Sequence, residues 1–197
     1  MNTITMDTQT LGILAIIVAL IAVAAWLLYR NRQSKLLEQR FGPEYGRTVN
    51  ELGSQPKAEA ELRARQKRVE KLDIVPLSAG DAARFSQAWR ALQGRFVDNP
   101  KGVLQEADTL VQELMQKRGY PMADFEGRAA DISVDHPSVV EHYRAAQAIA
   151  IRDQRGEADT EDMRRAVVHY RALFDELLEV APAQQQERTR QPMEARS

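Results

Sequence analysis

The feature that most constrains this chain is a run of 19 residues without a charge, from Leu11 to Tyr29. About 20 apolar residues are enough for a helix to cross the roughly 30 Å hydrocarbon core of a bilayer. The run is apolar on every side, and the rest of the chain is too polar and too short to bury such a helix. We therefore predict a transmembrane helix over residues 10–29, with Trp26 and Tyr29 at the headgroup level.

A cleaved signal peptide is the main alternative to a membrane anchor. Ala22-Val23-Ala24 has the small residues of a cleavage site. However, no Lys or Arg lies before Arg30, and the apolar run continues beyond this point through Trp26, Leu27 and Leu28. Both features favour an uncleaved anchor.

The charges on the two sides of the run predict its orientation. Only Asp7 precedes it, whereas four cations follow it closely: Arg30, Arg32, Lys35 and Arg40. Positively charged flanks stay in the cytoplasm, so residues 1–9 are expected outside and the C-terminal domain inside. The absence of cysteine fits a reducing compartment and is compatible with either side.

Charge is unevenly distributed along the chain. Residues 30–72 hold 11 Lys or Arg against 6 Asp or Glu, whereas residues 73–197 hold 16 against 21. A basic segment beside the membrane is attracted to anionic lipid. The lipid bilayer is thus one expected partner, and nucleic acid is not, because a basic surface with stacking aromatic residues is missing.

Residues 30–77 are expected to form a basic, helical juxtamembrane linker. The membrane helix should continue to Phe41-Gly42-Pro43, followed by a short helix over Pro43–Leu52. A charged helix from Pro56 to Leu72 carries a thin apolar stripe interrupted by Arg65, which is typical of either a solvent-exposed stalk or a weak coiled-coil strand. An extended connector, 73–77, follows. A coiled-coil strand would make the chain a weak homo-oligomer.

Residues 78–180 are expected to fold into a compact helical bundle, so the fold class is all-α. Helix signals define four longer helices and one short one, and residues 181–197 read as a disordered tail. The first longer helix is expected to begin at Ser78, with Asp81 as its capping partner, and the second to begin at Asn99-Pro100 and end at Gly119. A short helix over Met122–Ile132 follows. The third longer helix is expected between Asp135-His136-Pro137 and Gly156, and the fourth between Asp159 or Thr160 and Pro182.

Few residues suggest chemistry. Without cysteine, thiol catalysis and Cys-based metal sites are excluded. His136 and His142 are six residues apart, which places them on opposing sides of a helix, so a metal site would need Asp135 and His169 as well. Capping by Asp135-His136-Pro137 and an exposed His142 ring are favoured over metal binding. Phosphate-binding glycine loops are absent, and we expect no cofactor and favour a role other than catalysis.

Aromatic residues outside the anchor have two interpretations. Trp89 lies in an apolar helical stripe, which is typical of core. Tyr120 and Phe125 lie near a loop that could contact a partner, although plugging the bundle is favoured. Asp131, Asp135 and His136 are further candidates for partner contact.

Several stretches of the chain resemble a family of uncharacterised bacterial single-pass membrane proteins. The resemblance covers roughly residues 36–178, and its most specific part is Asp131–Arg144. It implies a bacterial single-span inner-membrane protein with a cytoplasm-facing or surface-exposed helical domain, and it carries no activity and no functional residue. The stretches that carry it are Phe41-Gly-Pro-Glu-Tyr45, Trp89 with Arg95-Phe-Val-Asp98 and Pro100, Arg118-Gly-Tyr-Pro121, Asp124-Phe-Glu126, Arg128-Ala-Ala-Asp131, Ser133-Val-Asp-His-Pro137 and His169-Tyr-Arg-Ala-Leu-Phe174.

Three functions agree with these features. The first is a membrane-anchored interaction or scaffold module that binds another protein at the cytoplasmic face. The second is a small-ligand or metal sensor, or an enzyme, that uses the turn between Asp131 and His142. The third is a self-associating accessory of division or envelope stress, paired through residues 57–72.

Overall fold

The computed structural model describes the backbone of residues 8–178 and the side chains of Leu14 and of residues 16–178. Two predictions fall on residues outside this part: the tail at 181–197, together with the helix end at Pro182, and the side chain of Leu11 at the start of the apolar run. The described residues form eight α-helices and no β-strand, which confirms the all-α prediction. The helices are α1 (Thr8–Phe41), α2 (Pro43–Leu52), α3 (Gln55–Val69), α4 (Ala79–Gly94), α5 (Pro100–Arg118), α6 (Phe125–Asp135), α7 (Val140–Gln154) and α8 (Thr160–Leu177).

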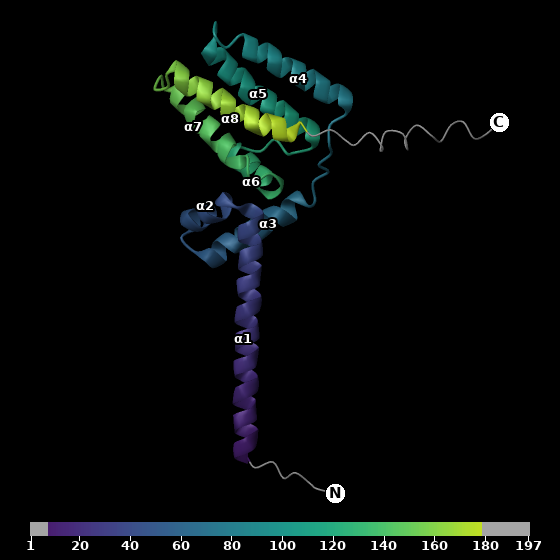
Figure 1. Ribbon diagram of the computed structural model, residues 1–197, viewed down its shortest axis with the longest axis vertical. Coiled ribbons are helices and arrows are strands. Elements are labelled where there is room, and N and C mark those ends of the chain that lie inside the picture. The colour runs from purple at the N-terminus through teal and green to yellow at the C-terminus, as the bar shows by residue number, and fades with distance from the viewer. Residues whose placement is uncertain (1–7, 179–197) are drawn as a thin grey trace, which may run out of the picture.

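Helix α1 is long and apolar enough to cross a membrane. It contains 34 residues, which corresponds to about 51 Å at the usual rise per residue. Figure 1 shows it projecting from the rest of the molecule as a single rod. It ends at Gly42, whose φ of +51° turns the backbone away from the helix, and Pro43 then opens α2. The predicted boundary at Phe41-Gly42-Pro43 is therefore confirmed.

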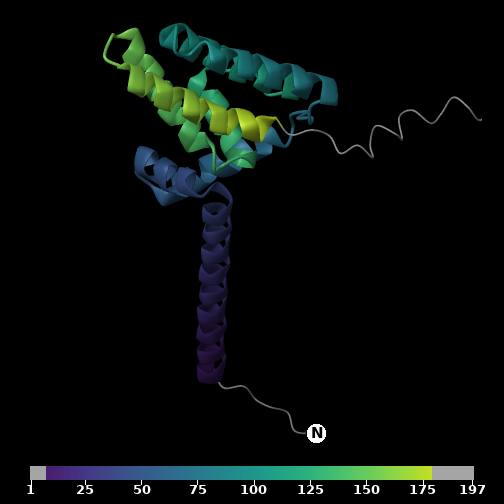
Figure 2. The same cartoon turned by 45° about the horizontal axis from the view of Figure 1, so that its top comes forward.

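Helices α2 and α3 lie across the end of α1 and beneath the other helices (Figure 1 and Figure 2). α3 packs against α1, α2 and α6. The stripe formed by Ala58, Leu62 and Val69 is buried within the chain itself. The expectation of a solvent-exposed stalk is therefore wrong, because this stripe packs against other helices of the same chain. A coiled-coil strand would have to use the same stripe, which is already covered.

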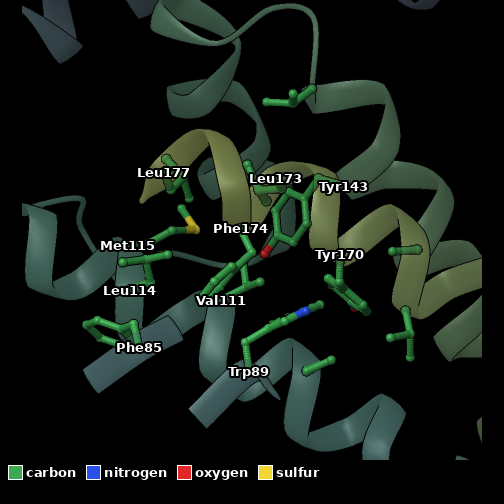
Figure 3. Close-up of a cluster of buried hydrophobic side chains, with 14 of the residues drawn as sticks. Phe85, Trp89, Val111, Leu114, Met115, Tyr143, Tyr170, Leu173, Phe174 and Leu177 are labelled. Carbon is green, nitrogen blue, oxygen red and sulfur yellow. The ribbon is translucent and has the colours of Figure 1, made fainter. Parts of the chain in front are cut away.

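Helices α4 to α8 form the predicted bundle of four longer helices and one short one. α8 packs against α5 and α7, and α4 packs on α5. Trp89 stacks on Phe174 with ring centroids 4.6 Å apart, so Trp89 belongs to the core as predicted. Figure 3 shows the large side chains that meet there: Phe85, Trp89, Val111, Leu114, Met115, Tyr143, Tyr170, Leu173, Phe174 and Leu177.

Local signals correctly predicted several helix ends. The Asn99 side chain accepts a hydrogen bond from the Gly102 amide at 3.0 Å and caps α5. Gly119 follows α5 with φ +98°, a conformation that disfavours side chains with a Cβ. The backbone of Gly119 lies against the carbonyl of Asp73 in the connector over 73–77. A second contact attaches this connector to the end of α5, because the Val75 amide donates to the Arg118 carbonyl at 2.9 Å.

Two expected boundaries are wrong. Asp135-His136-Pro137 does not begin a helix, because α6 continues through Asp135 and buries Ile132 and Val134 on the way. α7 begins at Val140, with no side-chain cap. The short helix predicted at Met122 starts three residues later, since Asp124 caps α6 by accepting from the Gly127 amide at 2.8 Å.

Candidate functional site at the junction of α1 and the bundle

The end of α1 meets the bundle in a second, smaller apolar cluster, separate from the main core. Leu37 and Phe41 come from α1, Leu62 and Val69 from α3, and Val134 from α6. Phe41 is fully buried. This cluster, with the ion pairs around it, is called the junction below. It joins the helix that can span a membrane directly to the folded domain.

A buried glutamate lies at the centre of the junction. The break at Gly42 and Pro43 places Glu44 in the first turn of α2, where a negative charge is favourable for the helix dipole. Its side chain is 0% exposed. Oε1 accepts from Arg65 Nη1 at 3.0 Å and from Arg144 Nη2 at 2.9 Å. A buried carboxylate is tolerated when it is paired in this way.

Each of these arginines also binds a carboxylate nearer the surface. Arg65 Nε donates to Glu61 at 3.0 Å, and Arg144 Nη1 donates to Glu126 at 2.6 Å. Burial would lower the pKa of Arg144, but its hydrogen bonds to Glu126 and Glu44 outweigh that effect and leave the pKa raised. The result is a continuous chain of alternating charges from α6 through α7 and α2 to α3.

A second ion pair joins α3 to α6. Arg68 donates to Asp131 Oδ1 through Nε at 2.8 Å and through Nη2 at 2.7 Å. The Asp131 carboxylate is almost fully buried. Asp131, predicted as a possible partner contact, is thus engaged within the chain, and its side chain fixes one helix to another.

The carboxylate of Glu59 gathers polar groups from three helices. Tyr45 donates to it at 3.1 Å and Gln55 at 3.0 Å, and Arg63 forms an ion pair at 3.3 Å. Burial by itself raises the pKa of Glu59. Hydrogen bonds from Ser34, Gln55 and Tyr45 and the charge of Arg63 lower this pKa by more than burial raises it, so the net shift is downward. Glu59 therefore stays ionised and links α3 to α2 and to α1.

The chemistry of the junction is that of attachment. Its carboxylates pair mainly with arginine, which keeps its proton at every physiological pH. Such pairs fix the positions of helices and do not transfer protons. The pairs reach from α2 and α3 to α6 and α7, and the apolar cluster packs the end of α1 against α3 and α6. Polar and apolar contacts together attach the bundle to the end of α1.

The structure brings together two of the four candidate metal-binding residues, His142 and His169, and places Asp135 and His136 elsewhere. His136 Nδ1 lies 3.0 Å from Glu176, whereas Asp135 is exposed at the end of α6. His142 Nδ1 and His169 Nδ1 face each other at 2.9 Å across α7 and α8. Among the described residues, no three His, Asp or Glu side chains are grouped so that they could hold a metal ion.

The two aromatic residues proposed for partner contact lie in or against the core. Tyr120 is 2% exposed. Phe125 packs against Tyr143, with ring centroids 4.8 Å apart. Both side chains thus fill the end of the bundle, which agrees with the favoured interpretation of this loop.

Sequence reasoning did not find Glu44 or Arg144. The one available signal was Arg65, a charge inside the apolar stripe of α3, because a charge in such a position needs a buried counterion. Its partners could not be identified from spacing, since Glu44 and Arg144 are 100 residues apart along the chain.

Comparisons with known proteins add no assignment to this site. A scan against models of protein families finds none that matches the chain. Searches of curated proteins and of solved structures find no match either. The functional argument therefore depends on the geometry described above.

Proposed function

We propose that this protein is a membrane-anchored helical interaction module that holds a partner protein at a fixed position near the cytoplasmic face of the membrane. The observation that carries the proposal is the junction, which continues the membrane helix into the folded domain without a flexible tether. A scaffold needs such a rigid link, because the position of its partner is then set by the anchor.

The surface of α1 supports membrane insertion. Ile16, Leu20 and Leu28 are each more than 60% exposed, and the rod stands clear of the bundle (Figure 1). Burying apolar surface stabilises by about 25 cal/mol per Å², so a helix uncovered on all sides gains strongly from lipid. Trp26 and Tyr29 lie at the end of this surface, where aromatic rings favour headgroups.

The proposed orientation rests on charge. Arg30, Arg32, Lys35 and Arg40 follow the apolar run, which favours a cytoplasmic position for the bundle. An alkaline phosphatase fusion at the C-terminus of the full chain tests this orientation. We expect no phosphatase activity in intact cells, and an active fusion would contradict the orientation.

The partner surface is proposed to be the groove between α4 and α5. The volume of this groove is 580 Å³. Its apolar lining residues are Ala88, Ala91, Leu92 and Leu110, and charged side chains, Arg95, Glu106 and Glu113, lie beside them. Both helices lie on the side of the bundle away from α1 (Figure 1 and Figure 2). Small and apolar side chains in a groove suit an amphipathic helix of another protein.

Site-specific photo-crosslinking in cells that make the full chain tests this surface. A crosslinker at Ala91, inside the groove, is expected to capture one discrete protein. The control position is Arg155, an exposed residue after α7, where that product should be absent. Equal products at both positions, or none at Ala91, would contradict the proposal.

A further inference from the structure

A groove separates α1 from α3 at the level where the apolar run ends. Its volume is 520 Å³. α1 contributes Trp26, Tyr29, Arg30 and Gln33, and α3 contributes Pro56, Glu59 and Arg63. The groove therefore combines the aromatic residues expected at a membrane interface with two guanidinium groups. Its two sides come from helices that are separated in the sequence by the whole of α2.

The positive charge of this groove exceeds its negative charge. Within the described residues, the Arg30 side chain has no carboxylate at ion-pair distance and lies over the Trp26 ring at 5.6 Å. Arg63 does pair with Glu59, at 3.3 Å. That carboxylate is shared, because Tyr45 and Gln55 also donate to it. Two guanidinium groups thus face the groove with one carboxylate that is already satisfied from inside the protein.

This excess belongs to a wider pattern. In α4 to α8, most described arginine and lysine side chains pair with a carboxylate, as Arg84, Arg152 and Arg164 do. Between residues 30 and 72 the balance is reversed, because four of the 11 cations pair in this way: Arg47, Arg63, Arg65 and Arg68. Within the described residues, no carboxylate lies at ion-pair distance from Arg30, Arg32, Lys35, Arg40, Lys57, Lys67 or Lys71. The counterions missing here are those that an anionic membrane surface supplies.

We propose that the groove between α1 and α3 binds the headgroup of an anionic phospholipid. Arg30 and Arg63 contact the phosphate, since guanidinium groups match phosphate oxygens in geometry and charge. Trp26 and Tyr29 lie beside the boundary between headgroup and acyl chain. This inference rests on the proposed membrane insertion of α1, and it adds a lipid partner to the proposed protein partner.

A bound headgroup would also stabilise the junction. Glu59 belongs both to this groove and to the polar contacts that tie α3 to α2, and Arg63 pairs with it on the same helix. A phosphate at Arg63 would hold α3 against the end of α1 from the membrane side. The lipid would then complete the attachment that the buried ion pairs make from the bundle side.

Tryptophan quenching by brominated lipid tests the site directly. The full chain is reconstituted in vesicles of dibrominated phosphatidylcholine that contain increasing fractions of unbrominated phosphatidylglycerol. Bromine quenches a tryptophan only at close contact, so Trp26 reports the lipid in the groove, and Trp89 in the bundle core gives a constant background. Protection of Trp26 by phosphatidylglycerol measures its affinity relative to phosphatidylcholine.

We expect the wild-type chain to prefer phosphatidylglycerol by up to about fivefold for each guanidinium that contacts the phosphate. R30Q/R63Q should bring the ratio close to one, and R30K/R63K should keep part of the preference, because lysine retains the charge and loses the planar geometry of the guanidinium. The matched control is R32Q/K35Q, which removes the same charge from α1 outside the groove and should leave most of the preference in place.

The outcomes separate this inference from the proposed function. Equal affinity for the two lipids in the wild-type chain would overturn the headgroup site and leave the anchor intact. An equal loss in R32Q/K35Q and R30Q/R63Q would also overturn it, because it would show general attraction to the surface. If brominated lipid does not quench Trp26 at all, α1 is not in the bilayer, and both proposals fail.

Discussion

Replacing Glu44 with glutamine removes the central charge of the junction and keeps the shape of the side chain. Removing one partner of a buried ion pair costs about 3–5 kcal/mol, because the remaining charge is left uncompensated. Here Arg65 and Arg144 each keep a second carboxylate, Glu61 and Glu126, whose side chains are 43% and 66% exposed. Exposed partners compensate only in part, so we expect E44Q to lower the free energy of unfolding by about 2–3 kcal/mol.

Urea unfolding of the full chain in nonionic detergent micelles, followed by far-UV circular dichroism, measures this loss. The control is E51Q on the same helix, because Glu51 is 46% exposed and pairs with Arg47 at the surface. Such pairs contribute about 0–1 kcal/mol, so E51Q should unfold close to wild type. If E44Q and E51Q unfold at the same urea concentration with the same slope, the argument that the junction is held by a buried charge is wrong.

Three further predictions concern the rest of the domain. Gly119→Ala should lower the free energy of unfolding by more than about 1 kcal/mol, because φ is +98° and the new Cβ would lie 2.3 Å from the Asp73 carbonyl oxygen. Gly46→Ala is the control: its Cβ would have nothing within 4 Å, and it should raise the free energy of unfolding by up to about 1 kcal/mol. Thermal unfolding of both variants measures the difference. Burial, and then the neighbouring His142 and Arg165, lower the pKa of His169 below 6.5, so the unfolded chain binds this proton more readily than the folded chain. The free energy of unfolding should therefore fall as the pH drops below 6.5 toward the folded-state pKa. Urea unfolding at a series of pH values from 7 to 5 should show a shallower fall in H169Q than in the wild-type chain. Calorimetric titration of the full chain with zinc should detect no micromolar binding, since two facing imidazoles lack the further ligands of a zinc site, and tight binding that H142N abolishes would refute this.

The sequence was sufficient for features that depend on neighbours along the chain. The apolar run, the break at Gly42 and Pro43 and the caps at Asn99 and Gly119 are local signals. The structure shows a helix throughout the run and helix ends at the other positions. Each follows from backbone geometry or from a side chain that reaches an amide three residues away. Such signals need no knowledge of the tertiary fold.

The junction was not predictable for the opposite reason. The stripe on α3 was visible, but its partners on α1 and α6 were not, so an exposed stalk seemed reasonable. Glu44 resembles any glutamate in the first turn of a helix until Arg144 is brought to it from 100 residues away. Asp135-His136-Pro137 misled for a related reason, since burial of Ile132 and Val134 extends α6 through the apparent cap.

The rigid link between α1 and the bundle is the central proposal, and a distance measurement tests it most directly. The chain has no cysteine, so spin labels can be placed at Leu36→Cys on α1 and Arg90→Cys on α4 without background labelling. Both positions are exposed. Double electron–electron resonance on the full chain in lipid nanodiscs should give one narrow distance distribution. A broad distribution, typical of a bundle on a flexible tether, would contradict the account.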